Sequence, residues 1–292
     1  MKEAYLYKKL EGGKVQCRNC AHYCLISPNE RGVCAVRENK NGTLFALNYS
    51  KAAACQIDPI EKKPFFHFLP HTFSLSIATV GCNFSCKNCQ NWEISQAPKP
   101  KKPVLGEKLT PAEIVKMALK NKLPSISYTY TEPAIFSEYA LDTMKIAKKA
   151  GLKNTWVTNG FWSKELFDLI SPYLDAANVD LKSFEDEFYK ETCHAKLQPV
   201  LDTLKRIKEK KIWLEVTTLI IPTLNDQPEN LKNIAQFIKE ELGQETPWHV
   251  TRFSGTISWQ LQHLPDTPLA TVKMAQEIGQ KIGLKNVHLG NV

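Results

Sequence analysis

After residue 72 the chain alternates short runs of β-branched and aromatic residues with longer segments whose apolar residues recur at helical spacing. Because strands alternate with helices, the pattern predicts parallel strands joined by helical crossovers. A repeat of roughly 25 to 35 residues predicts an α/β fold over residues 73–292, a (β/α)6 partial barrel of the TIM type. The predicted strands are Phe73–Val80, Ser125–Thr131, Asn154–Thr158, Ala177–Leu181, Ile212–Ile221 and Trp248–Phe253.

Polar and glycine residues mark the ends of the predicted helices. Thr110 and Glu113, with Pro111 at the first helical position, match a capping box. Two further starts are predicted by Asp226 with Glu229 and by Thr267 with Pro268. Left-handed C-terminal caps are predicted at three glycines, Gly151, Gly243 and Gly283.

The first 72 residues differ from the rest of the chain. They carry five cysteines and short turns at Gly12–Gly13 and Asn41–Gly42, but no long periodic helix. We therefore predict two domains, a small cysteine-rich N-terminal lobe over residues 1–72 and the partial barrel over residues 73–292.

The composition is that of a protein with a large core. The chain has 292 residues, of which 43% are hydrophobic and 23% charged. Its longest apolar runs fall far short of the roughly 18 residues of a membrane-spanning helix, and Met1–Leu10 is charged throughout, so we expect a cytoplasmic protein.

The net charge of +8 is spread along predicted helices, as at Lys145, Lys148 and Lys149. This distribution favours a solvated basic surface, suited to docking an acidic electron donor, over a specific nucleic-acid site. The nine cysteines are an odd number, and seven of them lie in two tight clusters. Metal binding is therefore favoured over a disulfide framework.

The first cluster follows the first predicted barrel strand and consists of Cys82, Cys86 and Cys89 in the spacing C-x3-C-x2-C. Structural zinc needs four ligands, and this motif supplies three. An iron-sulfur cube with three cysteine ligands leaves its fourth iron open to the amino and carboxylate groups of a bound molecule. The alternative is that these thiols pack as small apolar side chains.

This motif resembles that of the radical S-adenosylmethionine superfamily, and residues 73–255 resemble the pyruvate formate-lyase activating enzymes. Further segments resemble the AmmeMemoRadiSam-system radical enzymes over nearly the whole chain: residues 58–64, 67–70, 81–96, 128–133 and 179–182. The resemblance implies that a [4Fe-4S] cluster at Cys82, Cys86 and Cys89 reductively cleaves S-adenosylmethionine. The resulting 5′-deoxyadenosyl radical would abstract a hydrogen atom. It also implies a low-potential electron donor of the ferredoxin or flavodoxin type, and a protein substrate or companion proteins.

The resemblance implies cofactor-binding roles for residues at the predicted strand ends: Glu132, Thr158, Asn159, Asp180 and Lys182. Glu132 would receive the methionyl amino group; the alternative is a helix N-terminal carboxylate favoured by the helix dipole. Asp180 and Lys182 point to the same side of a strand, so they could instead form a structural ion pair. Ser254 stands where related families place a histidine, which leaves His249 as a candidate.

The second cluster has the spacing C-x2-C-x3-C-x9-C, formed by Cys17, Cys20, Cys24 and Cys34. This spacing predicts a second metal site, and it fits zinc and a second [4Fe-4S] cluster equally. The alternative is a set of reduced cysteines packed in a small lobe. Cys55 and Cys193 are single thiols, for which we expect ordinary packing.

Three functions are compatible with these features. The favoured one is an activating-enzyme-like radical reaction at a protein glycine or another unactivated C–H bond. The second is a radical modification of a small molecule with companion proteins. A zinc-stabilised nucleic-acid-binding protein is the alternative of another class. The sequence alone identifies no catalytic residue.

Overall fold

The computed structural model describes residues 1–99 and 101–292, and their chain forms two compact units. The first unit contains residues 1–84 and 91–176, and the second contains residues 85–90 and 177–292. All six predicted barrel strands are confirmed: β9 (Phe73–Ala78), β11 (Ser125–Tyr128), β12 (Lys153–Thr158), β13 (Ala176–Asp180), β14 (Trp213–Ile220) and β15 (Trp248–Arg252). The predicted domain boundary after residue 72 remains a prediction.

The sheet of the first unit is mainly parallel. β9 pairs in parallel with β11, and β11 pairs in parallel with β12. An additional strand, β8 (Ala54–Pro59), pairs antiparallel with β9 and was missed by the sequence pattern. Most of its residues are partly or fully exposed, because it is an edge strand, and so it lacks the apolar alternation by which a strand is recognised.

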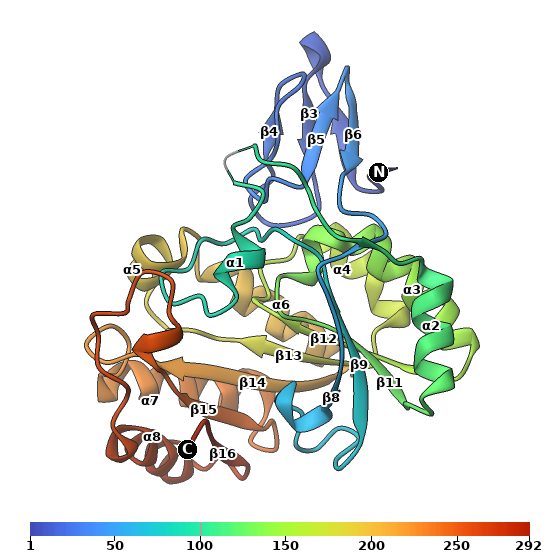
Figure 1. The fold of residues 1–292 in the computed structure, drawn as a ribbon. Helices are drawn as coiled ribbons and strands as arrows, with labels where there is room; N and C mark the ends of the chain where they lie inside the picture. The colour runs from blue at the N-terminus through green and yellow to red at the C-terminus, as the bar shows by residue number, and fades with distance from the viewer. Residues whose placement is uncertain (100) are drawn as a thin grey trace. The chain divides into compact units, whose positions relative to one another are not determined.

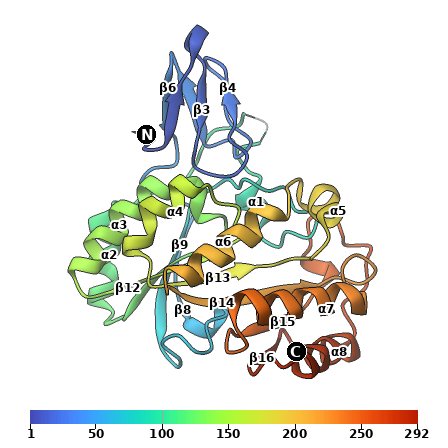
Figure 2. The same cartoon turned by 180° about the vertical axis from the view of Figure 1, so that it is seen from behind.

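Three helices cover one face of these strands: α2 (Pro111–Lys120), α3 (Ser137–Lys149) and α4 (Lys164–Ile170) (Figure 2). The capping box that begins α2 is confirmed. The Thr110 hydroxyl accepts from the Glu113 N–H at 3.3 Å, and the Glu113 carboxylate accepts from the Thr110 N–H at 2.7 Å. Ile114, Val115 and Ala118 of α2 are buried, as the helical spacing predicts.

The cysteine-rich N-terminal segment forms small antiparallel sheets that stand at one end of the first unit (Figure 1). A core of Ala4, Val15, Cys17, Ile26 and Leu44 lies between them. The sheets have the orders β1-β6-β5 and β2-β3-β4, and β7 pairs with β10. The strands are β1 (Lys2–Glu3), β2 (Tyr7–Lys9), β3 (Val15–Cys17), β4 (Leu25–Ile26), β5 (Arg37–Lys40), β6 (Thr43–Ala46), β7 (Lys51–Ala52) and β10 (Glu107–Lys108).

A buried ion pair joins this segment to α3. The Arg37 guanidinium donates to both carboxylate oxygens of Glu138, at 3.0 and 2.6 Å. Both side chains are almost completely inaccessible to solvent. The paired geometry satisfies the two charges within the protein.

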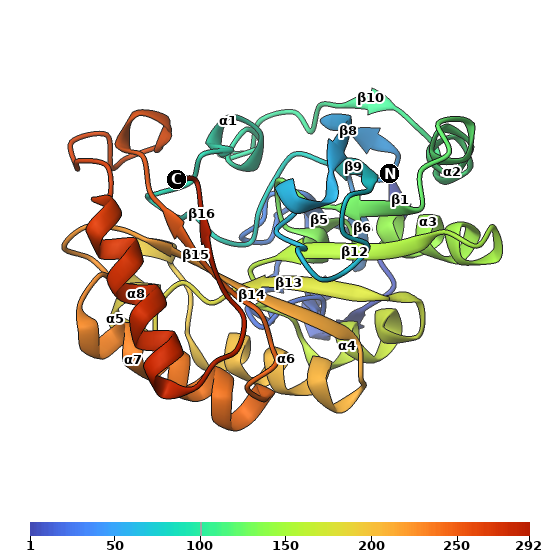
Figure 3. The ribbon, with the colours of Figure 1, turned by 90° about the horizontal axis from the view of Figure 1, so that it is seen from below.

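The second unit contains β13, β14, β15 and a further strand, β16 (Val287–Gly290). β14 and β15 are parallel, as are β15 and β16. Its helices are α6 (Gln198–Glu209), α7 (Pro228–Phe237) and α8 (Leu269–Ile282), and α8 lies against β15 and β16 (Figure 3). The sequence pattern missed β16, because only one of its four residues is fully buried.

Two predicted helix starts lie within two residues of the starts of α7 and α8, but the predicted capping residues make other contacts. Asp226 accepts from the Thr223 N–H at 2.9 Å within a turn, and α7 begins at Pro228 without a side-chain cap. Thr267 instead joins two strand ends, since its hydroxyl donates to the Ile220 carbonyl at 2.5 Å and accepts from the Phe253 N–H at 3.1 Å.

The predicted glycine caps differ in outcome. Gly283 is a left-handed cap with φ 107°. Gly151 also has a positive φ, 79°, directly after the C-cap Ala150. Gly243 has φ 91° but ψ 144°, so it ends its helix in a different conformation that also favours glycine.

The remaining helical segments are short: α1 (Trp92–Ser95), α5 (Asp186–Phe188), the 3₁₀ turns η1 (Glu11–Gly13), η2 (Ile60–Lys62), η3 (Pro133–Phe136), η4 (Ser171–Tyr173) and η7 (Gly255–Ile257), and the π-helical turns η5 (Tyr189–Cys193) and η6 (Ile238–Leu242). Within the described ranges, no helix has the length and apolarity required to span a membrane.

Candidate functional site

The cysteine loop leaves β9 through Gly81, whose φ of 100° favours glycine. A Cβ at this position would lie 2.7 Å from Val36 Cγ1 and 2.9 Å from the Cys34 carbonyl oxygen. The Cys82 sulfur, in the first unit, accepts from the Phe84 N–H at 3.4 Å. Gly81 therefore allows the turn that carries the first predicted cluster ligand.

The rest of the cysteine loop, residues 85–90, belongs to the second unit and runs beside the π-helical turn η5. The Ser85 N–H donates to the Cys193 carbonyl at 3.2 Å, and the Lys87 N–H donates to the Thr192 carbonyl at 2.9 Å. The turn ends at His194, which has a left-handed backbone with φ 56°. Single π-helical turns are frequent at functional sites, and this one supports the loop that carries Cys86 and Cys89.

Cys193 contacts a predicted cluster ligand. Its buried thiol forms a hydrogen bond with the Cys86 thiol, and this bond, followed by burial, raises the pKa of Cys86 well above its ordinary value. The expectation of simple packing for Cys193 thus missed a thiol–thiol contact. No sequence spacing signals this contact, because the two cysteines are 107 positions apart.

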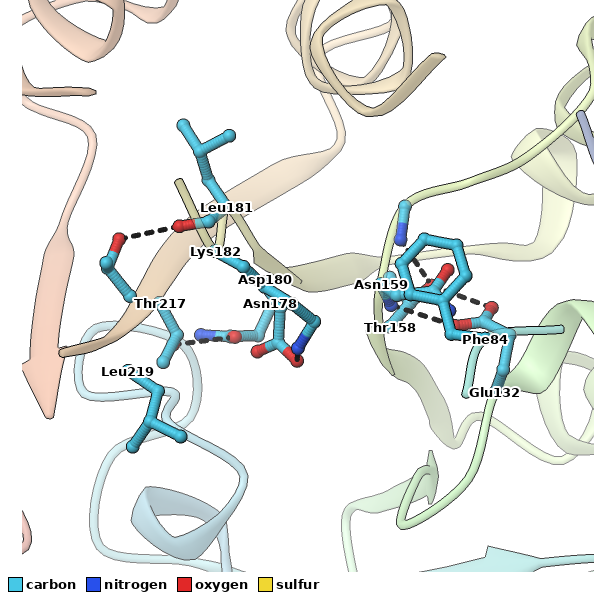
Figure 4. Close-up of polar contacts among 12 residues, drawn as sticks. Phe84, Glu132, Thr158, Asn159, Asn178, Asp180, Leu181, Lys182, Thr217 and Leu219 are labelled. Carbon is cyan, nitrogen blue, oxygen red and sulfur yellow. Dashed lines mark hydrogen bonds and ion pairs between the residues drawn. The ribbon is translucent and has the colours of Figure 1, made fainter. Parts of the chain in front are cut away.

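Glu132 brings together the ends of β11 and β12. Its carboxylate accepts from the Ala134 N–H at 3.0 Å, from the Asn159 N–H at 2.8 Å and from the Thr158 hydroxyl at 2.8 and 2.9 Å (Figure 4). The side chain is 1% exposed, and burial raises its pKa, although these hydrogen bonds oppose the shift. Glu132 also caps the short helix η3, in accordance with the alternative prediction of a helix N-terminal carboxylate.

A fourth donor also reaches the Glu132 carboxylate. The Trp162 indole N–H is 3.3 Å from Glu132 Oε1 and 3.0 Å from the Thr158 hydroxyl oxygen, so it is shared between them. Together with Ala134, Asn159 and Thr158, Trp162 fills the roughly four lone-pair positions of a carboxylate, so an ammonium group would share a position with one of these donors or displace it.

Asn159 links the end of β12 to the cysteine loop. Its amide group donates to Asn83 Oδ1 at 2.8 Å, and its carbonyl oxygen accepts from the Phe161 N–H at 3.0 Å. Asn83 directly follows Cys82, so the predicted cofactor residues Glu132, Thr158 and Asn159 share one buried network with this part of the loop.

Asp180 and Lys182 form an ion pair of 2.8 Å at the end of β13 in the second unit (Figure 4). Burial lowers the pKa of Lys182, but Asp180 and the thiols of Cys86 and Cys193 outweigh this effect and raise the pKa well above its ordinary value. The Lys182 N–H donates to the Tyr189 hydroxyl at 3.0 Å, which attaches the strand end to η5. Lys182 therefore interacts with the Cys86 thiol as well as with Asp180.

The sequence reasoning missed a buried charged cluster in the first unit. The Lys63 ammonium lies 2.7 Å from Asp58 Oδ2 and 4.1 Å from the centre of the Tyr130 ring. The Tyr130 hydroxyl donates to the same carboxylate oxygen. Asp58 is 5% exposed and Lys63 is 2% exposed. Asp58 and Tyr130 are 72 positions apart. The only signal in the sequence is that these polar residues lie in two segments that carry the family resemblance.

His249 of β15 pairs with a carboxylate on the neighbouring strand β14, away from the strand ends that carry the predicted cofactor residues. Its Nε2 atom is 2.7 Å from Glu215 Oε2, and both side chains are buried. His249 is the second residue of β15 and Glu215 is the third residue of β14. The pair thus lies near the amino ends of the strands, whereas ligands of parallel barrels bind at the carboxyl ends.

The four N-terminal cysteines line one cavity with Arg37 and Asn83. Burial is the largest cause that raises the pKa of Cys17, to about 12, and the pKa of Cys24 is raised for the same reason. Throughout residues 1–99 and 101–292, no three His, Cys, Asp or Glu side chains are grouped so as to hold a metal ion directly.

Comparison with known proteins defines the class. The model of the Radical SAM superfamily matches residues 76–238. Uncharacterized protein MJ0808 of Methanocaldococcus jannaschii is 46% identical over 292 residues, covering 100% of this chain and 86% of that protein. The pyruvate formate-lyase-activating enzyme of Clostridium pasteurianum is 25% identical over 168 residues, which cover 54% of this chain and 66% of the enzyme.

Solved structures show the same fold. A domain of pyruvate-formate lyase-activating enzyme from Bacteroides vulgatus has a TM-score of 0.50 at 17% identity, covering 56% of this chain and 98% of that one. Streptococcus suis SuiB bound to S-adenosylmethionine has a TM-score of 0.56 at 13% identity, covering 73% of this chain and 49% of that one. The predicted α/β fold of the partial-barrel type is confirmed.

The chain has parallel strands, a cysteine loop directly after β9 and polar residues at the carboxyl ends of its strands. This arrangement is typical of α/β enzymes that bind a cofactor at the strand ends. The chain belongs to the radical SAM superfamily. Membership implies a [4Fe-4S] cluster and S-adenosylmethionine, whereas the roles of the individual residues remain predictions.

Proposed function

We propose that this protein cleaves S-adenosylmethionine reductively at a [4Fe-4S] cluster held by Cys82, Cys86 and Cys89, and abstracts hydrogen from an unactivated C–H bond. The bound cluster and cofactor would supply the 5′-deoxyadenosyl radical. The single observation that carries this proposal is the placement of the C-x3-C-x2-C motif directly after β9 in a chain of this family.

The donor and acceptor groups at the strand ends suit the two charged groups of the methionyl part. Glu132 is a buried carboxylate held by Thr158 and Asn159, and a carboxylate is a strong acceptor for an ammonium donor. Lys182 offers a largely buried cation to a carboxylate, and Asp180 lies 2.8 Å from that cation. We therefore assign Glu132, Thr158, Asn159, Asp180 and Lys182 to cofactor binding.

The substrate class that we favour is a protein glycine. Relatives of this chain include activating enzymes, among them the Clostridium pasteurianum enzyme, and these act on proteins by name. The family match also favours an enzyme over the zinc-stabilised nucleic-acid-binding alternative. A ferredoxin or flavodoxin would supply the electron, and its acidic surface complements the net charge of +8.

The test is release of 5′-deoxyadenosine by anaerobically reconstituted protein supplied with S-adenosylmethionine and dithionite. We expect release by the wild type and by Cys55→Ala, a thiol outside both cysteine clusters, and none by Cys82→Ala, Cys86→Ala or Cys89→Ala. A verified cluster-loaded sample that releases none would refute the proposal.

A further inference from the structure

Four thiols of the N-terminal segment face one enclosed space. Cys17 ends β3, Cys24 directly precedes β4, and the Cys17 N–H donates to the Cys24 carbonyl at 2.9 Å. Cys20 is held by a β-bridge to Trp162, and Cys34 lies beside Gly81. Backbone pairing from several directions thus fixes the four residues around the cavity that they line.

The number and type of the four thiols fit zinc and a [4Fe-4S] cluster alike, so the other groups on the cavity wall distinguish the two. Zinc brings no hydrogen-bond acceptor of its own, whereas a [4Fe-4S] cube brings four sulfides that accept N–H donors.

Two buried donors on the cavity wall lack an acceptor. Arg37 directs its two terminal nitrogens to Glu138, but its Nε atom has no partner. Asn83 uses its carbonyl oxygen for Asn159, and its Nδ2 atom also has no partner. Both side chains are 1% exposed and both line the cavity. Unpaired buried donors are uncommon, and here they indicate an acceptor-rich, negatively charged occupant.

We propose that Cys17, Cys20, Cys24 and Cys34 bind an auxiliary [4Fe-4S] cluster, with Arg37 and Asn83 donating hydrogen bonds to its sulfurs. A cube is wider than a single ion, and its sulfide and thiolate sulfurs accept N–H donors. All four irons would have protein ligands, so none would be open to a substrate. The role that remains is electron transfer.

Asn83 connects the cavity with the first ligand of the proposed catalytic cluster. It lines the cavity and directly follows Cys82. Its backbone carbonyl oxygen is 2.8 Å from Nε2 of His22, another cavity residue. One electron would pass from an external low-potential donor to the auxiliary cluster, and then toward Cys82. The donor is oxidised by one electron and the receiving cluster is reduced by one.

The decisive sample is the Cys82→Ala/Cys86→Ala/Cys89→Ala variant, purified anaerobically and analysed for iron, sulfide and zinc. We expect roughly four irons per chain, absorbance near 400 nm and an electron paramagnetic resonance signal after dithionite. One zinc per chain, or no metal, would overturn the proposal. Because this variant lacks the proposed catalytic cluster, its result is independent of whether the wild type releases 5′-deoxyadenosine.

Two further samples keep the proposal testable if that variant does not fold. Wild-type protein should contain roughly eight irons, and S-adenosylmethionine should alter the spectrum of only one of two reduced clusters. Cys17→Ala/Cys24→Ala should lose about half of the iron, whereas the control Cys55→Ala should lose none. Four irons in the wild type, all responding to S-adenosylmethionine, would refute the auxiliary cluster.

Discussion

Removing the Arg37 side chain should destabilise the first unit strongly. In Arg37→Met, the Glu138 carboxylate loses both of its charged hydrogen bonds, at 2.6 and 3.0 Å, and stays buried. Removal of one partner of a buried ion pair costs about 3–5 kcal/mol. At about 2–4 °C per kcal/mol for a domain of this size, the melting temperature should fall by roughly 6–20 °C.

The stability of Arg37→Met should depend on pH in a way that a simple packing defect would not produce. In the wild type, burial tends to raise the pKa of Glu138, but Arg37 reverses this effect and lowers the pKa below 4.5. That interaction stabilises the fold above pH 4.5 and is lost as the pH falls. Without Arg37, burial raises the folded pKa above 4.5, so the penalty in Arg37→Met should shrink as the pH falls from 7 toward 5.

Thermal and denaturant unfolding of a double-mutant cycle measures the effect. Arg37→Met/Glu138→Leu removes both charges and should be more stable than Arg37→Met alone. The control is Arg31→Met, since the Arg31–Glu38 pair has a similar distance of 2.9 Å but is about one-fifth exposed. It should cost no more than about 1 kcal/mol. Additive effects of the two substitutions, or equal losses in Arg37→Met and Arg31→Met, would refute the reasoning; iron content is measured in every variant.

Three other substitutions test the site and its support. Glu132→Gln should keep its iron but raise the KM for S-adenosylmethionine by roughly 10–100-fold, because one charge-assisted hydrogen bond contributes about 1.5–3 kcal/mol; an unchanged KM would remove Glu132 from cofactor binding. Gly81→Ala should lower the free energy of unfolding by about 1–3 kcal/mol, because Gly81 has φ 100° and an added Cβ would lie 2.7 Å from Val36. Gly12→Ala, with φ 66° and open space around it, should lower the free energy of unfolding less. Equal losses would show that the contact with Val36 has no effect. Asp58→Asn should reduce the loss of stability that the wild type shows below pH 4. Burial raises the pKa of Asp58, but Lys63, Tyr130 and Lys62 outweigh burial and hold the pKa well below 3.8. The wild-type carboxylate therefore stabilises the fold above pH 3.8, and this stabilisation is lost as the carboxylate becomes protonated. The exposed Asp168→Asn serves as its control, and an identical acid limb for both variants would contradict the assigned interaction.

The Asp58–Lys63–Tyr130 cluster and the Cys86–Cys193 contact could not be predicted from the sequence, because their members come from distant segments. Asp58, Lys63 and Tyr130 meet because β8 is antiparallel to β9 and β11 is parallel to it. Cys193 meets Cys86 because η5 runs beside residues 85–87. In both cases the partners belong to segments whose pairing is decided by the packing of whole elements.

The sequence by itself determined the six barrel strands, the capping box of α2 and the positions of both cysteine motifs, because these features follow from periodicity and short spacing. It also determined which polar residues follow which strands. Only the tertiary structure decided that Thr267 joins two strands, that Cys193 contacts Cys86, and that Arg37 and Asn83 leave unpaired donors on one cavity. The physical reason is that a hydrogen bond or a cavity wall depends on where distant segments meet, and this is decided by burial of the whole core.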